Sequence, residues 1–116
     1  MKVIPYQKVK EEQAEQGAHE VTVRWLITED DGAENFAMRY FTVAPQGFTP
    51  YHSHAWEHEV FILEGQGVVR IGDHTKELVK GIVIFIPPNV KHQFTNPSIH
   101  PLRFLCMIPN RDTSLD

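Results

Sequence analysis

Four histidines in two short stretches of the chain have the spacing of metal ligands. His52, His54 and His58 lie within one stretch, and His92 follows in the sequence PPNVKHQFTN. Alternate residues of an extended segment point to the same side, so His52 and His54 can present both rings to one ion. His58 can reach that ion from the next strand and His92 from a third, and imidazoles suit first-row metals. The spacing predicts one four-histidine metal site; the alternative is a set of unrelated surface histidines.

The charge of such a site indicates its chemistry. Neutral imidazoles leave a divalent metal with its full charge, so it remains a strong Lewis acid. If the ion is six-coordinate, four protein ligands leave two positions for water, substrate or dioxygen, and open positions distinguish a catalytic site from a closed structural one. A structural zinc site is the alternative, although such sites use closer ligand spacings and often cysteine.

Short stretches of strand-like composition, separated by turn residues, must position these side chains. The expected strands are residues 20–28, 35–44, 48–54, 58–63, 68–71, 74–79, 82–86, 92–95 and 102–108. Turn residues separate them, most clearly at 64–67 and 72–73. Only residues 11–18 could support a helical turn, and Gly17 makes it a poor one. Strands at this density predict an all-β domain, a double-stranded β-helix of the jelly-roll type.

The region around the first three histidines resembles the first motif of the metal cupins. That motif places a His-x-His pair and a following glutamate between two glycines. In this chain Gln46 replaces the first glycine, His58 stands at the glutamate position and Gly65 closes the motif. The resemblance therefore implies a ligand set without a carboxylate.

A second cupin motif follows downstream. The residues that match it are Gly81, Pro87, His92 and Asn96. Asn89 replaces an internal glycine, and asparagine tolerates the left-handed backbone that such a turn requires. More narrowly, residues 35–109 resemble the small four-histidine manganese cupins, which share the HxHxWEHE run. The resemblance implies a cupin barrel with one divalent transition metal per chain, manganese before iron, with zinc, nickel, cobalt or copper as further candidates.

An apolar pocket is expected beside the metal. Phe104, Cys106 and Ile108 share one face of the last strand, and related cupins use this face as the pocket wall. Trp56 and Phe94 are the other apolar candidates, although Trp56 could instead pack at a subunit contact. Ordinary core packing is the alternative for Phe104 and Ile108. Cys106 is also a candidate catalytic residue, but a lone cysteine on an apolar strand is most often a small buried hydrophobe.

Arg39 lies between Met38 and Tyr40 in a strand otherwise suited to burial. A charge inside a barrel costs several kcal/mol unless it is paired. We therefore expect Arg39 to anchor an anionic group of the substrate beside the metal, as a candidate catalytic residue. The alternative is an outward-facing arginine paired with a surface glutamate.

Length and charge limit the classes of function. The 116 residues suit one domain, residues 1–116, with its core at about 35–109. A net charge of −4 without a Lys/Arg cluster argues against nucleic acid or an anionic membrane as partner. No apolar stretch approaches the ~20 residues that span a bilayer, and no signal-peptide pattern opens the chain, so we expect a cytoplasmic protein. The single cysteine excludes an intrachain disulfide framework.

The preferred functional hypothesis is an oxidoreductase, a dioxygenase or peroxide-using oxygenase acting on a small electron-rich or anionic molecule through manganese or iron. The first alternative is a redox-neutral isomerase, cyclase or decarboxylase of a small sugar acid or keto acid, for which the sequence shows no obvious general base. The second alternative is a non-catalytic small-molecule binding module.

The N-terminal residues 2–10 alternate as a strand does and suit addition to a sheet edge. Small cupins often lend this segment to a partner subunit, so we expect a homodimer. A strand folded back on its own sheet is the alternative.

Overall fold

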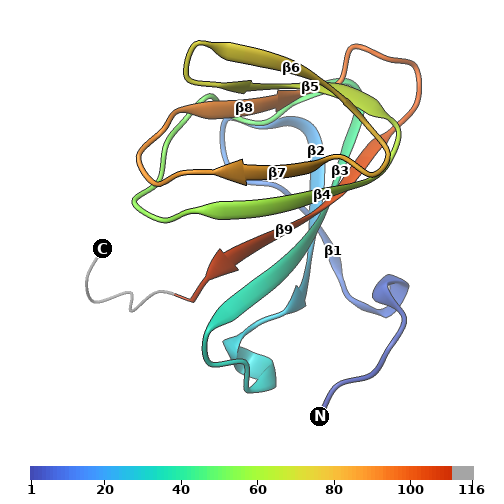
Figure 1. Ribbon diagram of the computed structural model, residues 1–116. Helices are drawn as coiled ribbons and strands as arrows, with labels where there is room; N and C mark the ends of the chain where they lie inside the picture. The colour runs from blue at the N-terminus through green and yellow to red at the C-terminus, as the bar shows by residue number, and fades with distance from the viewer. Residues whose placement is uncertain (111–116) are drawn as a thin grey trace.

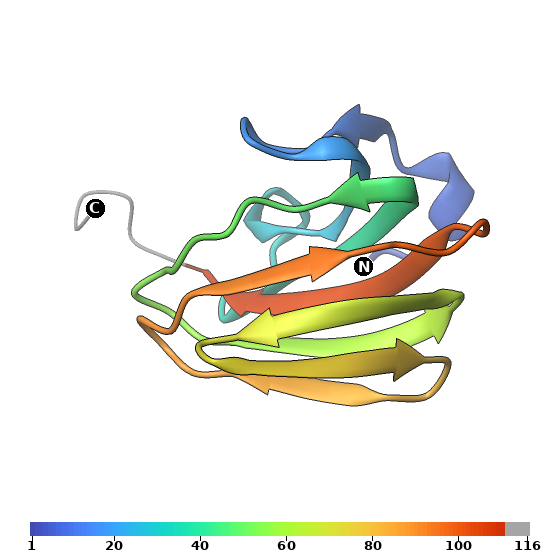
Figure 2. The same ribbon diagram turned by 90° about the horizontal axis from the view of Figure 1, so that it is seen from above.

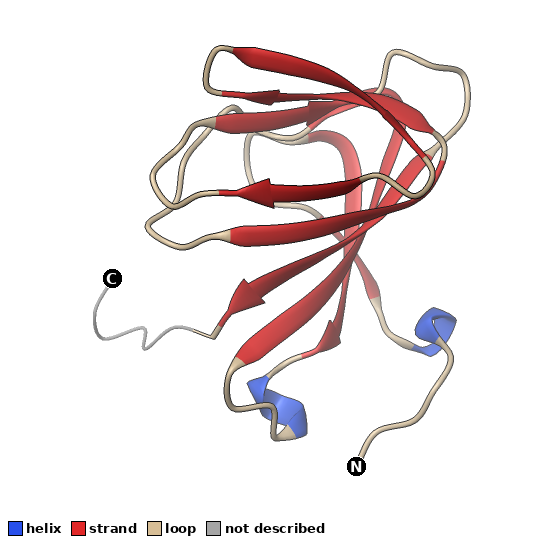
Figure 3. Ribbon diagram, viewed as in Figure 1, coloured by secondary structure: helices blue, strands red, loops and turns tan. Residues whose placement is uncertain are grey.

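The computed structural model describes residues 1–110. Over this range the chain forms nine strands and two single 3-10 turns, shown in Figure 3. The strands are β1 (Glu11–Gln13), β2 (His19–Ile27), β3 (Phe36–Phe48), β4 (His58–Glu64), β5 (Gln66–Ile71), β6 (His74–Val79), β7 (Val83–Ile86), β8 (His92–Thr95) and β9 (Leu102–Pro109). The 3-10 turns are η1 (Tyr6–Lys8) and η2 (Glu29–Asp31). In residues 1–110 no helix has the length and apolar character needed to cross a membrane.

The strands form one antiparallel sheet in the order β6-β5-β8-β3-β9-β4-β7, and β2 pairs with β3 while β1 pairs with β2. The sheet is strongly curled (Figures 1 and 2), and its β6 end contacts β4. The curl closes a barrel around an apolar interior, and this arrangement confirms the predicted jelly roll.

Strand β9 shows how the sequence pattern makes the core. Leu102, Phe104 and Cys106 are at most 3% exposed, whereas the residues between them are partly exposed. Phe104 stacks on Phe41 and Phe94, with ring centroids 5.2 and 4.5 Å apart. Because side chains alternate across a strand, one face of β9 belongs to the buried core.

Strand β3 differs from the prediction. Residues 35–44 and 48–54 were expected as two strands, but β3 is continuous from Phe36 to Phe48. Gln46 adopts a left-handed φ of 68° and donates its N–H to the Asn96 carbonyl at 2.7 Å, so the irregularity is a bulge and not a turn. Beyond it, Pro50 has no N–H to donate, and only an isolated bridge between His52 and His92 continues the pairing.

The N-terminal segment also differs from the prediction. Residues 2–10 form no strand; the turn η1 follows Pro5, and the first strand is β1. Residues 11–18, which the sequence made a poor candidate for a helical turn, form strand β1 over Glu11–Gln13 and a turn closed by the Ala18 N–H and the Glu15 carbonyl. Pro5 has no N–H to donate to a neighbouring strand, so the alternating pattern of residues 2–10 did not lead to a strand. The segment is held by Tyr6, whose ring stacks on Tyr40 with centroids 4.6 Å apart.

Candidate metal centre

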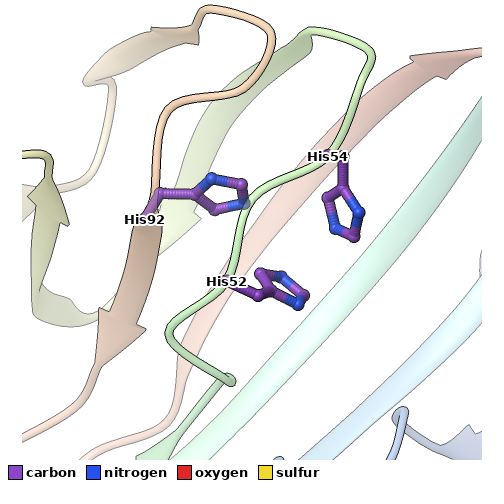
Figure 4. A group of neighbouring side chains, drawn as sticks. All are labelled: His52, His54 and His92. Carbon is purple, nitrogen blue, oxygen red and sulfur yellow. The ribbon is translucent and has the colours of Figure 1, made fainter.

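Three histidines bring their ring nitrogens together at one end of the barrel. One nitrogen each from His52, His54 and His92 lies within 4.8 Å of the other two, close enough to hold a metal ion (Figure 4). His52 and His54 come from the connection after β3, and His92 begins β8. Backbone hydrogen bonds hold His52 beside His92. The His52 N–H donates to the His92 carbonyl at 3.2 Å, and the His92 N–H donates to the His52 carbonyl at 2.8 Å.

His58, the first residue of β4, adds a fourth ring beside this group. Its centroid lies 4.8 Å from that of His92 and 5.2 Å from that of His54. The side chain is buried, and its Nδ1 has no hydrogen-bond partner among the described residues. A buried polar atom without a partner costs free energy, so His58 has an unsatisfied ring nitrogen beside the group of three. The residues present therefore suit a metal, and three of the four predicted ligands already form a compact group.

The ionisation of the histidines also suits a metal. Burial, with repulsion from His92 and Arg39, lowers the pKa of His58 to about 3. Burial likewise lowers the pKa of His92, whose Nδ1 lies 3.0 Å from the Val90 carbonyl. That carbonyl holds the proton on Nδ1 and leaves Nε2 with a free lone pair. Neutral imidazole is the form that binds metals, so these rings need not lose a proton near neutral pH.

Two cavities that share lining residues, among them Arg39 and His54, border the histidines. The inner cavity, about 40 Å³, lies between the histidines and the core side chains Phe94, Phe104 and Cys106. The outer cavity, about 380 Å³, is lined by apolar side chains that include Trp56 and Ile108. All of the predicted pocket residues therefore border these cavities. Phe94 and Phe104 are at most 5% exposed, so they also serve as ordinary core residues.

Arg39 lines both cavities. Its Nη2 donates to the Cys106 sulfur at 3.1 Å, and its Cζ lies 4.9 Å from the Phe41 ring centroid and 5.3 Å from that of Trp25. The guanidinium thus lies beside the cavities, and none of the ion pairs within residues 1–110 joins it to a glutamate.

Comparison with known families settles the relationship suggested by the motifs. Residues 39–108 match the model of the cupin domain (Cupin_2). The chain belongs to the cupin family. The matched segment runs from Arg39 to Ile108 and includes all four histidines of the site.

Several relatives of this cupin have solved structures or assigned activities. The polyketide cyclase RemF from Streptomyces resistomycificus is 41% identical with a TM-score of 0.89, over 94% of this chain and 79% of that chain. A cupin-2 domain from Rhodospirillum rubrum is 27% identical with a TM-score of 0.83, over 96% and 76% of the two chains. The 1-methylthio-D-xylulose 5-phosphate methylsulfurylase of R. rubrum is 35% identical over 71 residues, 61% of this chain. The match covers 46% of that protein, so this cupin spans about half the length of that relative.

Cys106 of this cupin is a buried thiol at the floor of the inner cavity. Burial raises the pKa of the Cys106 thiol, although the neighbouring Arg39 acts in the opposite direction. The thiolate is the nucleophilic form of cysteine. A raised pKa therefore argues against Cys106 as a nucleophile and favours a packing role.

The structure adds an acidic residue to this cupin's site that the sequence did not suggest. Glu15 lines both cavities, and its Oε2 lies 3.8 Å from Nδ1 of His52. Ala14 and Ala18 on either side pack against the core, and the Ala18 N–H closes a turn by donating to the Glu15 carbonyl at 3.1 Å. The only signal in the sequence is this AEQGA turn, which carries no ligand spacing. Its approach to the histidines depends on how the β1–β2 hairpin docks.

Proposed function

We propose that this cupin is a metal-dependent, redox-neutral cyclase of a small polyketone, a molecule with several carbonyl groups in 1,3 relation. The observation that carries the proposal is Glu15, the only acid among the described residues that line the inner cavity. A carboxylate beside the histidines supplies the general base that redox-neutral chemistry requires. The polyketide cyclase RemF, 41% identical over 94% of this chain, points to ring closure as the reaction.

The donor set fits one divalent first-row metal, held by His52, His54 and His92 together with His58. When bound, the metal supplies Lewis acidity that polarises a carbonyl oxygen of the substrate. Manganese is our first choice and iron the second, because the narrower resemblance is to manganese cupins.

The chain's own residues perform the proton chemistry. The Glu15 carboxylate accepts a proton from a methylene group between two carbonyls, and the resulting carbanion attacks a ketone carbon of the same molecule. A C–C bond forms, the ketone oxygen becomes an alkoxide, and that alkoxide takes the proton back from Glu15. Loss of water then gives the unsaturated ring, so no external oxidant is consumed.

The outer cavity suits such a molecule. Trp25, Phe41 and Trp56 line it, and their flat faces can stack on a planar conjugated substrate. Trp56 is itself stacked on His54, with centroids 4.3 Å apart, which keeps an aromatic surface directly beside the histidines. The cavity combines these aromatic faces with charged and polar side chains that include Arg39 and Glu15, and small-molecule sites use such polar groups to orient a ligand.

The test compares metal forms under air and under nitrogen. A linear aromatic poly-β-ketone should cyclise at the same rate in both atmospheres, and the zinc form should retain activity because zinc has no redox chemistry. Product mass should equal the substrate mass or that mass less water. Inactivity of every metal form toward such substrates, with metal content verified, would reject the cyclase.

The oxidoreductase predicted from the sequence is the second candidate. Neutral imidazoles leave the metal its full charge and two free positions, which also suits activation of dioxygen or peroxide. Oxygen uptake that accompanies turnover, together with an inactive zinc form, would favour this candidate over the cyclase.

A further inference from the structure

Arg39 carries a charge that no carboxylate of residues 1–110 balances with an ion pair. Its Nη2 reaches only the Cys106 sulfur, a weak acceptor, and its Nε is buried without a hydrogen-bond partner among the described residues. Burying an unpaired charge costs several kcal/mol. The Arg39 guanidinium therefore borders the cavities with some of its N–H groups lacking a hydrogen-bond acceptor.

The neighbours of Arg39 hold this group in place but do not neutralise it. The rings of Phe41 and Trp25 lie against the guanidinium, and such contacts stabilise a cation by about 0.5–2 kcal/mol. Backbone pairing also fixes the position, since Arg39 pairs with Cys106 on β9 and with Trp25 on β2. An arginine held in this way presents a fixed fork of N–H groups, which matches two oxygens of a planar anion.

We infer that Arg39 is the binding site for a planar organic oxyanion, either a carboxylate or the enolate of a 1,3-dicarbonyl, carried by a flat apolar body. The oxyanion binds the guanidinium, and the body lies against the aromatic walls of the outer cavity. The inference deepens the proposed function, because it assigns the anionic end of the substrate to Arg39. It requires no metal, so it can be tested separately from catalysis.

Two acids line the same space and bear on this inference. Glu12 and Glu15 are both exposed, and they border the outer cavity. Water screens the charge of an exposed carboxylate, whereas the Nε of Arg39 is shielded from solvent. The attraction between a bound anion and Arg39 therefore exceeds its repulsion by the two glutamates.

The experiment measures binding to the metal-free protein by calorimetry. One arm compares 2-naphthoate, which offers two oxygens to the fork, with the neutral 2-naphthamide. The other compares 1,3-cyclohexanedione, an enolate at neutral pH that offers one oxygen at a time, with cyclohexanone. In the wild type each anion should bind more tightly than its neutral partner. Arg39→Met should weaken the anions by roughly 10- to 150-fold, the range for charge-assisted hydrogen bonds, and leave the neutral compounds unchanged. The control Arg70→Met removes an equal charge from β5, where the Arg70 side chain lies over Tyr51 at 4.4 Å, outside both cavities.

A second measurement separates binding from a structural role. If Arg39 serves a ligand, Arg39→Met should melt at or above the wild-type temperature, because an uncompensated charge has been removed. Marked destabilisation by Arg39→Met, equal affinity for the charged and neutral compounds, or no anion binding at millimolar concentration would each overturn the inference. If only the carboxylate or only the enolate binds more tightly than its neutral partner, that oxyanion is the group that Arg39 recognises. Anion binding without cyclase activity would support this site and reject the proposed reaction.

Discussion

The carboxylate of Glu15 lies 3.8 Å, Oε2 to Nδ1, from the imidazole of His52. The two residues come from different parts of the sheet, the β1–β2 connection and the loop after β3. Gly17 helps to place Glu15: its φ of 96° suits glycine, and a Cβ at this position would lie 3.3 Å from Pro50. The contact therefore couples an N-terminal turn to the loop that carries two of the histidines.

Replacing Glu15 tests its role as the proton acceptor. Glu15→Gln keeps the size of the side chain but removes its basicity, so turnover of a poly-β-ketone should fall by roughly 10²- to 10⁴-fold. Metal content should stay unchanged, because the glutamate is not one of the ligands. Glu12→Gln is the matched control, since Glu12 lines only the outer cavity, and it should keep turnover within a few-fold of wild type. Equal turnover in the two variants would remove Glu15 from the mechanism.

The ligand set can be tested by metal analysis of purified variants after dialysis. His92→Ala and His52→Ala should bind the metal at least 10-fold more weakly, because each removes a donor nitrogen. His58→Glu should retain the metal, since glutamate is the usual cupin ligand at this position. His74→Ala, which changes an exposed histidine on β6, is the control. Full occupancy in the His92→Ala protein would contradict the four-histidine centre.

The metal-free protein should lose stability in mild acid. The pKa of His58 is about 3 in the fold against an ordinary value of 6.5, so the unfolded chain takes up this proton first. The stabilisation from neutral His58 is therefore complete above about pH 6.5 and is lost as the pH falls from there toward 3. Since one pKa unit is worth about 1.4 kcal/mol, the loss should amount to a few kcal/mol.

Melting curves from about pH 7.5 to pH 4.5 measure this loss. His58→Gln should show a shallower decline than wild type, and parallel declines would reject the assignment to His58. At neutral pH, a chelator should lower the wild-type melting temperature, because the metal binds only the folded state.

We expect a homodimer, and the structure suggests where its contact lies. Strand β7 ends the sheet order, and the outer face of β4 and β7 exposes Phe61, Val83 and Phe85 by 45, 72 and 55%. Among the described strands β7 pairs only with β4, and a strand paired on one side beside an exposed apolar face suits pairing with the same strand of a second copy. Phe85→Lys should then shift the mass seen by light scattering from two chains to one, whereas Ile99→Lys, at an exposed position elsewhere, should not.

Deletion of residues 1–10 distinguishes a dimer formed through β7 from a dimer formed by exchange of the N-terminal segment, the arrangement expected from the sequence. If the segment is exchanged, the deletion will dissociate the dimer and Phe85→Lys will leave it intact. A single-chain mass for the wild type across a micromolar range would contradict both arrangements.

The parts of the site that local spacing determines could be predicted from the sequence. His52 and His54 are two residues apart, and alternation along β9 placed Phe104 and Cys106 on one buried face. The left-handed turn expected at Asn89 is present, with a φ of 64°, and its N–H donates to the His54 carbonyl at 2.6 Å. Each of these features depends on a few neighbouring residues.

The parts that depend on distant contacts could not be predicted. Glu15 contacts His52 because the β1–β2 hairpin packs against the barrel. The residue types and spacing around Glu15 do not predict that packing. Residues 45–47 have the composition of a turn. Gln46 nevertheless continues β3, because its N–H donates to the carbonyl of Asn96, a residue far from it in the sequence. Local composition indicates where a chain can turn, whereas long-range pairing decides whether it does.

The outer cavity draws its walls from two separate stretches of the chain. The histidines lie within residues 39–108, the segment shared with other cupins, whereas Glu12, Glu15, Val23 and Trp25 precede it. The β1–β2 hairpin thus shapes the space in front of the histidines without contributing one of them. A change in this hairpin would therefore alter both the shape of the cavity and the acid beside His52, while the four histidines stayed in place. Exchange of the hairpin between two small cupins would show how far it determines which ligands the cavity accepts.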